Sequence, residues 1–192
     1  VFGLSDSTAL QNALYTKSGN VSYTGFLPAY DFKSGRLDEQ IEKSLLAVFT
    51  GNKQKITGGM CLQAGKATGV MVGGCLSVFC SLCGTPYFPD LKDKILLLED
   101  VGEKTYKVER MLKQLSMQPG FARIKGIVLG QFVNCMEADA GDGTMEEIVQ
   151  DFVSGLKVPA VYGFSYGHQQ SRYILPVGKE VFFDAGKCLL EY

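Results

Sequence analysis

The 192-residue sequence has no tryptophan, a single histidine and no excess of charge of either sign. Its 19 basic and 20 acidic residues give a formal net charge of −1, and no run of lysine or arginine exceeds two residues. A protein that binds the phosphate backbone of nucleic acid needs a basic surplus or patch, and an anionic membrane surface attracts basic clusters. The charge pattern therefore argues against nucleic acid and against a membrane as partners.

Long hydrophobic runs are also missing. The longest apolar stretch, GVMVGGCLSVFCSLCG at residues 69–84, is interrupted by glycines and is shorter than the ~20 apolar residues that a membrane-spanning helix needs. Hydrophobic residues nevertheless make up 46% of the chain, so a substantial buried core can form.

The six cysteines do not follow the spacing of a small disulfide-rich domain, and a chain of this length does not need one. Cys80 and Cys83 form a CxxC motif, but a zinc site would require a second CxxC or CxxH, which the sequence lacks. We therefore expect free, mostly buried thiols, packing rather than redox chemistry at the CxxC motif, and no metal. The cysteines are Cys61, Cys75, Cys80, Cys83, Cys135 and Cys188.

Apolar periodicity predicts a mixed α/β fold, with parallel crossovers early in the chain and antiparallel strands near its end. Predicted strands include residues 1–4, 94–100 and 124–135, the last with a flexible tail, and predicted helices include residues 36–51 and 104–115. Glycine-punctuated β structure is expected between residues 52 and 74, and two or three antiparallel strands are expected after residue 172. A boundary near residues 35–55 divides the chain into a leading piece, residues 1–40, and a main domain, residues 41–192.

Local signals predict where several of the helices begin and end. Asp6 or Ser7 can cap a helix that starts at Thr8, and residues 26–36 resemble a loop. Gly51 is suited to ending the helix before it. The motif Thr144 to Glu147 is a capping box that starts another helix.

The opening segment GLSD at residues 3–6 has the pattern of a nucleophile elbow. In such an elbow, a strand, a sharp turn and a helix follow one another, and the turn projects a serine hydroxyl. The helix then offers a backbone N–H, here that of Asp6, to a developing oxyanion. The second glycine of the full pattern is replaced by Ser7. The alternative is that Ser5 belongs only to a helix cap.

Two further candidates could complete a serine hydrolase site. His168 follows Gly167 in a turn after a strand and carries the only imidazole that could act as a base near neutral pH. Glu99 and Asp100 close an apolar strand, where an acid can orient an imidazole. The alternatives are a structural or surface histidine and a pair of acids that cap the following helix. Arg172 is expected to be an exposed strand arginine, the alternative being a partner for a substrate carboxylate.

Three separated blocks give the chain a resemblance to a known family. They are GLSDSTAL at residues 3–10, GGCLSVFCSLCGTPYFPDLKDKILLLEDVGEKTYKVERMLKQL at residues 73–115 and GHQQSRYILPVGKEVFFD at residues 167–184. In this order and at these separations the blocks resemble the LD-carboxypeptidases, serine peptidases that trim muropeptides, and their relatives that confer immunity to microcin C.

The resemblance implies roles for individual residues. Ser5 would be the nucleophile, His168 the general base and Glu99 the acid that orients the histidine, with the Asp6 backbone N–H as an oxyanion donor. Two positions depart from the family pattern, because Leu4 replaces a common aromatic residue and Cys75 replaces a usual asparagine.

The resemblance also implies a fold and an organisation. Family members carry a Rossmann-like N-terminal region, with a glycine-rich turn that supplies a second oxyanion N–H, before the elbow. The chain would then be the C-terminal part of a two-domain protein, comprising the end of that region and a mixed β/α LD-carboxypeptidase domain. We expect this part to be weakly active or inactive unless the preceding segment is supplied.

The function implied is a cytoplasmic, homodimeric, cofactor-free enzyme that removes the terminal D-alanine from the tetrapeptide stem of muropeptides during peptidoglycan recycling. One alternative is hydrolysis of the aminoacyl-nucleotide amide of a microcin C-type antibiotic. The absence of tryptophan, a ring suited to stacking on a nucleobase, argues against it. Another alternative is a binding domain that kept the fold without the catalysis.

Overall fold

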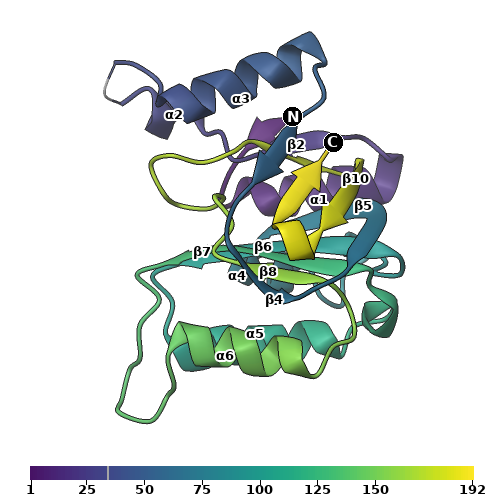
Figure 1. Cartoon of the computed structure of the whole chain (residues 1–192), viewed down its shortest axis with the longest axis vertical. Helices are drawn as coiled ribbons and strands as arrows, with labels where there is room; N and C mark the ends of the chain where they lie inside the picture. The colour runs from purple at the N-terminus through teal and green to yellow at the C-terminus, as the bar shows by residue number, and fades with distance from the viewer. Residues whose placement is uncertain (34) are drawn as a thin grey trace.

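The computed structural model describes residues 1–33 and 35–192, and its helices and strands alternate from β5 to β8 (Figure 1). The helices are α1 (Ser7–Ser18), α2 (Pro28–Asp31), α3 (Glu39–Thr50), α4 (Leu76–Ser81), α5 (Thr105–Ser116) and α6 (Met145–Ser154), with 3-10 turns η1 (Phe121–Arg123) and η2 (Ala185–Lys187). The strands are β1 (Phe2–Gly3), β2 (Ser22–Thr24), β3 (Lys55–Thr57), β4 (Met60–Gln63), β5 (Lys66–Cys75), β6 (Lys94–Val101), β7 (Gly126–Val133), β8 (Ala160–Tyr162), β9 (Leu175–Val177), β10 (Glu180–Asp184) and β11 (Leu189–Glu191).

Across the described residues, the strands form an eight-stranded sheet of order β3-β11-β10-β5-β6-β7-β8-β4 and a three-stranded sheet of order β1-β2-β9. Strands β5, β6, β7 and β8 pair in parallel, and the helices α4, α5 and α6 make the crossovers between them. Strands β9, β10 and β11 all pair antiparallel with their neighbours. The predicted mixed α/β class, parallel early and antiparallel late, is confirmed.

The large sheet separates two clusters of buried side chains, because successive residues of β6 point to opposite faces. Leu96 and Leu98 belong to the cluster beneath α4, α5 and α6, and Figure 1 shows α5 and α6 side by side below the sheet. Ile95 and Leu97 belong to the opposite cluster, which also contains Leu4 from the start of the chain. The parallel strands are therefore covered on both faces, as such strands require.

A smaller cluster attaches the leading residues to the rest of the molecule. Ile41 of α3 packs with Phe26 and Ile174, and the Ser44 hydroxyl accepts a hydrogen bond of 2.9 Å from the Ile174 backbone N–H. In Figure 1, α2 and α3 lie at the opposite end of the molecule from α5 and α6. In the described ranges, no helix combines the length and the apolar character needed to cross a membrane.

Most local predictions are confirmed, and two are wrong. Gly51 ends α3 in the left-handed conformation, and Thr144 and Glu147 form the expected capping box. The predicted loop at residues 26–36 contains the short helix α2, which begins at a proline; Ser34 lies outside the described residues. The division of the chain at residue 40 remains a prediction.

The second wrong prediction concerns the start of α1. Asp6 occupies the N-cap position with helical backbone angles, and within the described residues its side chain makes no capping hydrogen bond. The Ser7 hydroxyl donates instead to the Leu4 carbonyl, at 2.8 Å. Neither side chain caps α1, because the turn before the helix is tight enough for Ser7 to reach back across it.

Candidate active site

Ser5 lies in a sharp turn between β1 and α1 and has the backbone geometry of a nucleophile elbow. Its φ angle is 62°, in the left-handed region that residues other than glycine seldom adopt. Such strain persists where the surrounding structure imposes it, and it is common at functional sites. Ser5 is partly exposed, and its carbonyl accepts the first hydrogen bond of α1, from the Thr8 N–H at 2.9 Å.

The elbow depends on the glycine two residues before Ser5. A Cβ atom at Gly3 would lie 2.0 Å from the Ser7 Oγ and 2.5 Å from the Ser7 Cβ. The close approach of Gly3 and Ser7 brings the strand directly onto the first turn of α1. Ser7 therefore occupies the position at which the full elbow pattern has its second glycine. Its side chain fits there because Gly3 has no side chain of its own.

Glu99 lies near the carboxyl end of β6, and its side chain is 0% exposed. The pairing of β6 with β7 shifts register between Leu98 and Asp100, so the regular ladder is interrupted at Glu99. Burial raises the pKa of the Glu99 carboxyl above its ordinary value, and the hydrogen bond to His168 opposes this shift. Its Oε1 atom is buried and has no hydrogen-bond partner among the described residues.

His168 contacts Glu99 directly. Its Nδ1 lies 2.8 Å from Glu99 Oε2, and the imidazole is 20% exposed. The hydrogen bond to Glu99 raises the pKa of His168, and burial partly opposes it. With Nδ1–H donating to the carboxylate, Nε2 is the nitrogen that can accept a proton.

The backbone before His168 is shaped to let this contact form. Gly167 has a φ angle of 125°, and a Cβ atom there would lie 2.8 Å from Glu99 Oε2. Only a glycine brings the loop this close to the buried carboxylate without displacing it.

Asp100 has a structural task that the sequence did not reveal. Its carboxylate accepts hydrogen bonds from the Ser77 backbone N–H at 2.8 Å and the Ser77 hydroxyl at 3.2 Å, at the start of α4. The Cys75 thiol also lies 3.4 Å from it. The N-cap of α5, the helix that follows β6, is Lys104. The alternative prediction that Glu99 and Asp100 cap this helix is therefore wrong.

The first turn of α1 lies against the end of β5, beside Glu99. The Thr8 hydroxyl accepts a 3.1 Å hydrogen bond from the Cys75 N–H, and Cys75 is the register partner of Glu99. The Asn12 amide exchanges two hydrogen bonds with the Gly73 backbone, at 2.9 and 3.0 Å. These bonds bring the elbow and the His168–Glu99 pair to the same end of the sheet.

The prediction that Arg172 is an exposed strand arginine is wrong. Arg172 lies in the loop before β9, its side chain is 0% exposed, and it forms an ion pair with Asp31. A buried guanidinium needs a partner of opposite charge. The carboxylate that satisfies Arg172 comes from this chain, so the alternative of a substrate carboxylate is not needed to explain it.

The sequence did not indicate Thr8, Asn12, Asp31 and Tyr166, whose side chains form hydrogen bonds that hold the site together, that of Tyr166 to the Thr24 hydroxyl. Their partners are distant in the chain: Asn12 binds Gly73, 61 residues away, and Asp31 binds Arg172, 141 residues away. The paired glycines Gly73 and Gly74 were the one local signal, because adjacent glycines in a strand indicate close approach of another backbone or side chain.

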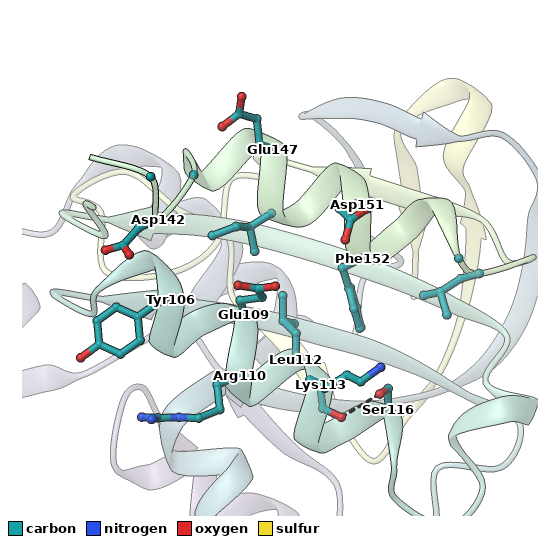
Figure 2. A pocket seen from close by; sticks show the side chains of 15 residues that line it. Tyr106, Glu109, Arg110, Leu112, Lys113, Ser116, Asp142, Glu147, Asp151 and Phe152 are labelled. Atoms are coloured by element: carbon teal, nitrogen blue, oxygen red, sulfur yellow. Dashed lines mark hydrogen bonds between the residues drawn. The ribbon is translucent and has the colours of Figure 1, made fainter. Parts of the chain in front are cut away.

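A groove of about 830 Å³ lies elsewhere, between α5 and α6. Figure 2 shows that Leu112 and Phe152 lie between the two helices, while charged side chains such as Arg110 and Asp142 extend outward. Neither Ser5, Glu99 nor His168 lines this groove, so it is separate from the candidate active site. The described residues contain no cluster of three or more histidine, cysteine or acidic side chains that could hold a metal ion.

Comparison with known proteins gives a consistent result. Residues 68–182 match the family described as LD-carboxypeptidase C-terminal domain. The chain is 35% identical over 186 residues to a putative carboxypeptidase of Streptomyces coelicolor, covering 95% of this chain and 58% of that protein. It is 30% identical over 182 residues to a probable murein peptide carboxypeptidase of Bacillus subtilis, covering 92% of this chain and 57% of that protein.

A solved structure supports the same family assignment. The muramoyltetrapeptide carboxypeptidase from Oxalobacter formigenes superposes with a TM-score of 0.88 at 29% identity, covering 99% of this chain and 66% of that chain. The chain thus spans less than two thirds of the length of these proteins. The family match covers more than half of its residues, and it includes both Glu99 and His168. The chain belongs to the LD-carboxypeptidase family.

Proposed function

We propose that this protein is a serine carboxypeptidase that removes the terminal D-alanine from the tetrapeptide stem of muropeptides. The observation that carries the proposal is the hydrogen-bonded pair of buried Glu99 and partly exposed His168, at the same end of the sheet as a serine in a strained elbow. The names of two similar proteins, a murein peptide carboxypeptidase and a muramoyltetrapeptide carboxypeptidase, support the substrate class.

In the proposed reaction, the Ser5 hydroxyl attacks the carbonyl carbon of the amide before the terminal D-alanine. His168 Nε2 accepts the hydroxyl proton as the C–O bond forms, and Glu99 stabilises the resulting imidazolium. The negative charge on the carbonyl oxygen is stabilised by the Asp6 backbone N–H at the start of α1. His168 then protonates the leaving nitrogen, D-alanine departs, and Ser5 carries the remaining peptide as an ester.

Water completes the cycle. His168 takes a proton from a water molecule, the resulting hydroxide attacks the ester carbonyl, and the proton returns to the Ser5 oxygen as the shortened peptide leaves. Every proton taken up by His168 is given back within a turnover. The proposed chemistry uses water, side chains and backbone N–H groups.

We further propose that the active protein includes a segment preceding Val1, is a homodimer and works in the cytoplasm. The greater length of the similar proteins supports the first part, and the family resemblance suggests the others. A second oxyanion donor from that segment would complete the site. Removal of one such donor typically costs about 10²–10³ in turnover, so we expect the 192-residue chain alone to be weakly active.

A microcin-type amide is the second candidate substrate. It is supported by the similarity to an MccF-like protein from Bacillus anthracis, at 28% identity and a TM-score of 0.79, because MccF is the name of a microcin C7 self-immunity protein of Escherichia coli. The absence of tryptophan still argues against nucleobase stacking, although the nine tyrosines could supply a ring. The third candidate is a binding domain without catalysis, and an experiment has to distinguish it from the two enzymes.

The test is mass spectrometry of a muropeptide with a tetrapeptide stem after incubation with the full-length gene product, beside its Ser5→Ala variant. The proposal expects loss of one alanine residue with the unmodified protein and none with the variant. Cleavage of an aminoacyl-nucleotide amide with the muropeptide left intact would favour the second candidate. No cleavage of either substrate by a folded protein would favour the binding domain.

A further inference from the structure

Arg172 binds three separate groups through one planar guanidinium. Its Nε donates to the Gly25 carbonyl at 2.9 Å, and its Nη1 donates to the Gln169 carbonyl at 2.6 Å. Its Nη2 donates to both carboxylate oxygens of Asp31, at 2.6 and 2.8 Å. Asp31 is itself fixed, because its Oδ2 also accepts from the Leu27 backbone N–H at 2.7 Å.

These partners belong to the two halves of the candidate active site. Gln169 follows His168 directly in the chain, whereas Gly25 lies beside the elbow strand. The Gly25 N–H donates to the Gly3 carbonyl at 2.9 Å, two residues before Ser5. One guanidinium therefore connects the loop that carries the imidazole with the strand that carries the serine.

A second link lies on the other side of His168. The Tyr166 hydroxyl, in a fully buried side chain, forms a 2.8 Å hydrogen bond with the Thr24 hydroxyl of β2. Hydrogen bonds from Tyr166 and from Arg172 thus lie on either side of His168 in the chain. Both reach β2 or the residue after it, and β2 pairs with β1. His168 is held to Glu99 by its own hydrogen bond and to the elbow by its neighbours.

Stability alone does not explain a buried ion pair of this kind. Removing two charges from water costs free energy, and replacement of a buried pair by apolar side chains of similar volume is often neutral or stabilising. What arginine adds is a rigid fork of donors with a fixed geometry. Such a fork is suited to setting the relative position of two backbone segments.

On the proposed function, we infer that Arg172, held by Asp31, is a positioning residue that sets the place of His168 relative to Ser5. It touches neither the substrate nor the reacting atoms in this account. It acts through the loop at residues 167–172, and a displacement of about 1 Å in a reacting group can cost about 10²-fold in rate.

The test uses the full-length protein with the double substitution Asp31→Leu and Arg172→Met, which removes both charges and all of the guanidinium hydrogen bonds. The matched control removes another ion pair, between Lys55 and Glu191 at the sheet edge, through Lys55→Met and Glu191→Gln. Three properties are measured for each: thermal unfolding, kcat and KM for D-alanine release, and the NMR titration of the His168 imidazole. The His168 signal is assigned by its loss in His168→Gln.

We expect the double variant to fold, with kcat reduced about 10–100-fold and KM changed less than about threefold. The Arg172 charge lowers the pKa of His168, so its removal by itself would move the titration midpoint upward. The His168 titration midpoint should nevertheless move toward 6.5, its ordinary value, as the loosened loop weakens the contact with Glu99. The control should match the unmodified protein in all three properties.

A folded double variant with unchanged kcat and an unchanged His168 titration would overturn the inference. If the double variant does not fold, Arg172→Lys serves in its place, since lysine keeps the charge but cannot form the fork; unchanged kcat and titration there would also overturn it. If the unmodified protein releases no D-alanine, the proposed function fails, and the titration alone decides whether Arg172 positions His168.

Discussion

His168 Nδ1 lies 2.8 Å from Oε2 of Glu99, a carboxylate with no exposed side-chain surface. The two residues are 69 positions apart in the chain and come from different elements, a loop and the central strand β6. A buried carboxylate in this position fixes both the orientation and the tautomer of the imidazole. The chemistry proposed for Ser5 depends on this relationship.

Glu99→Gln should reduce kcat by about 10⁴-fold while leaving the fold intact. The glutamine amide can donate to Nδ1, which favours the tautomer protonated at Nε2 and leaves no base facing the serine. Steady-state kinetics together with circular dichroism would measure both effects. Glu109→Gln, at an exposed position of α5, is the matched control, and equal kcat values for the two variants would contradict the role of Glu99.

The rate should depend on pH through His168. The hydrogen bond to Glu99 raises the pKa of His168 above 6.5, and the imidazole must be neutral to accept the serine proton. We therefore expect kcat/KM to rise with pH through a midpoint above 6.5. In Glu99→Gln the residual activity should show a lower midpoint. A pH–rate profile that has the same midpoint in both proteins would contradict this assignment.

Stability should change with pH in the opposite direction. Because the pKa of His168 is raised in the folded state, its protonation stabilises the fold fully below 6.5, and this contribution is lost as pH rises through the folded-state pKa. The free energy of unfolding of the unmodified protein, minus that of His168→Gln, should therefore decrease across this range. Urea unfolding at a series of pH values measures the difference.

The contact between Gly3 and Ser7 in the elbow can be tested with a second substitution that relieves the effect of the first. Gly3→Ala should destabilise the protein and lower activity, because the new methyl group would collide with the Ser7 side chain, 2.0 Å from its Oγ. Adding Ser7→Gly removes the obstacle and should restore most of both. Thermal unfolding and kcat of the single and double variants provide the measurement. A double variant as impaired as Gly3→Ala alone would show that the contact is not the cause.

The cysteines should react according to their burial. Burial raises the pKa of Cys75 and of Cys80 to about 12, so at pH 8 only about one thiol in 10⁴ is ionised. We expect iodoacetamide to leave both unmodified in the folded protein and to modify both after unfolding, as read by peptide mass mapping. Rapid modification of Cys80 in the folded state would instead indicate a reactive CxxC motif.

The sequence predicted what depends on local chemistry. The capping box at Thr144, the glycine that ends α3 and the apolar strand at residues 94–100 each follow from neighbouring residues, and each is present. The pairing of His168 with Glu99 was implied by a family resemblance, and the hydrogen bond between them agrees with it. The catalytic roles of Ser5, Glu99, His168 and the Asp6 N–H remain predictions.

What the sequence could not predict depends on contacts across the chain. An arginine two residues after two glutamines resembles a solvated surface residue, yet Arg172 is buried because Asp31 lies against it in space. The helix α2 has four residues, too few for an apolar period to be recognised. The antiparallel pairing of β9 with β2 likewise joins segments from the two ends of the chain.

The most direct test of the account is the site of covalent reaction with a serine-directed fluorophosphonate probe. The full-length protein is treated with the probe, digested and analysed by mass spectrometry, beside Ser5→Ala and His168→Gln. We expect one adduct, on the peptide that contains Ser5, absent in Ser5→Ala and formed at least about 10³-fold more slowly in His168→Gln. An adduct on another serine, or no adduct on a folded protein that releases D-alanine, would contradict it.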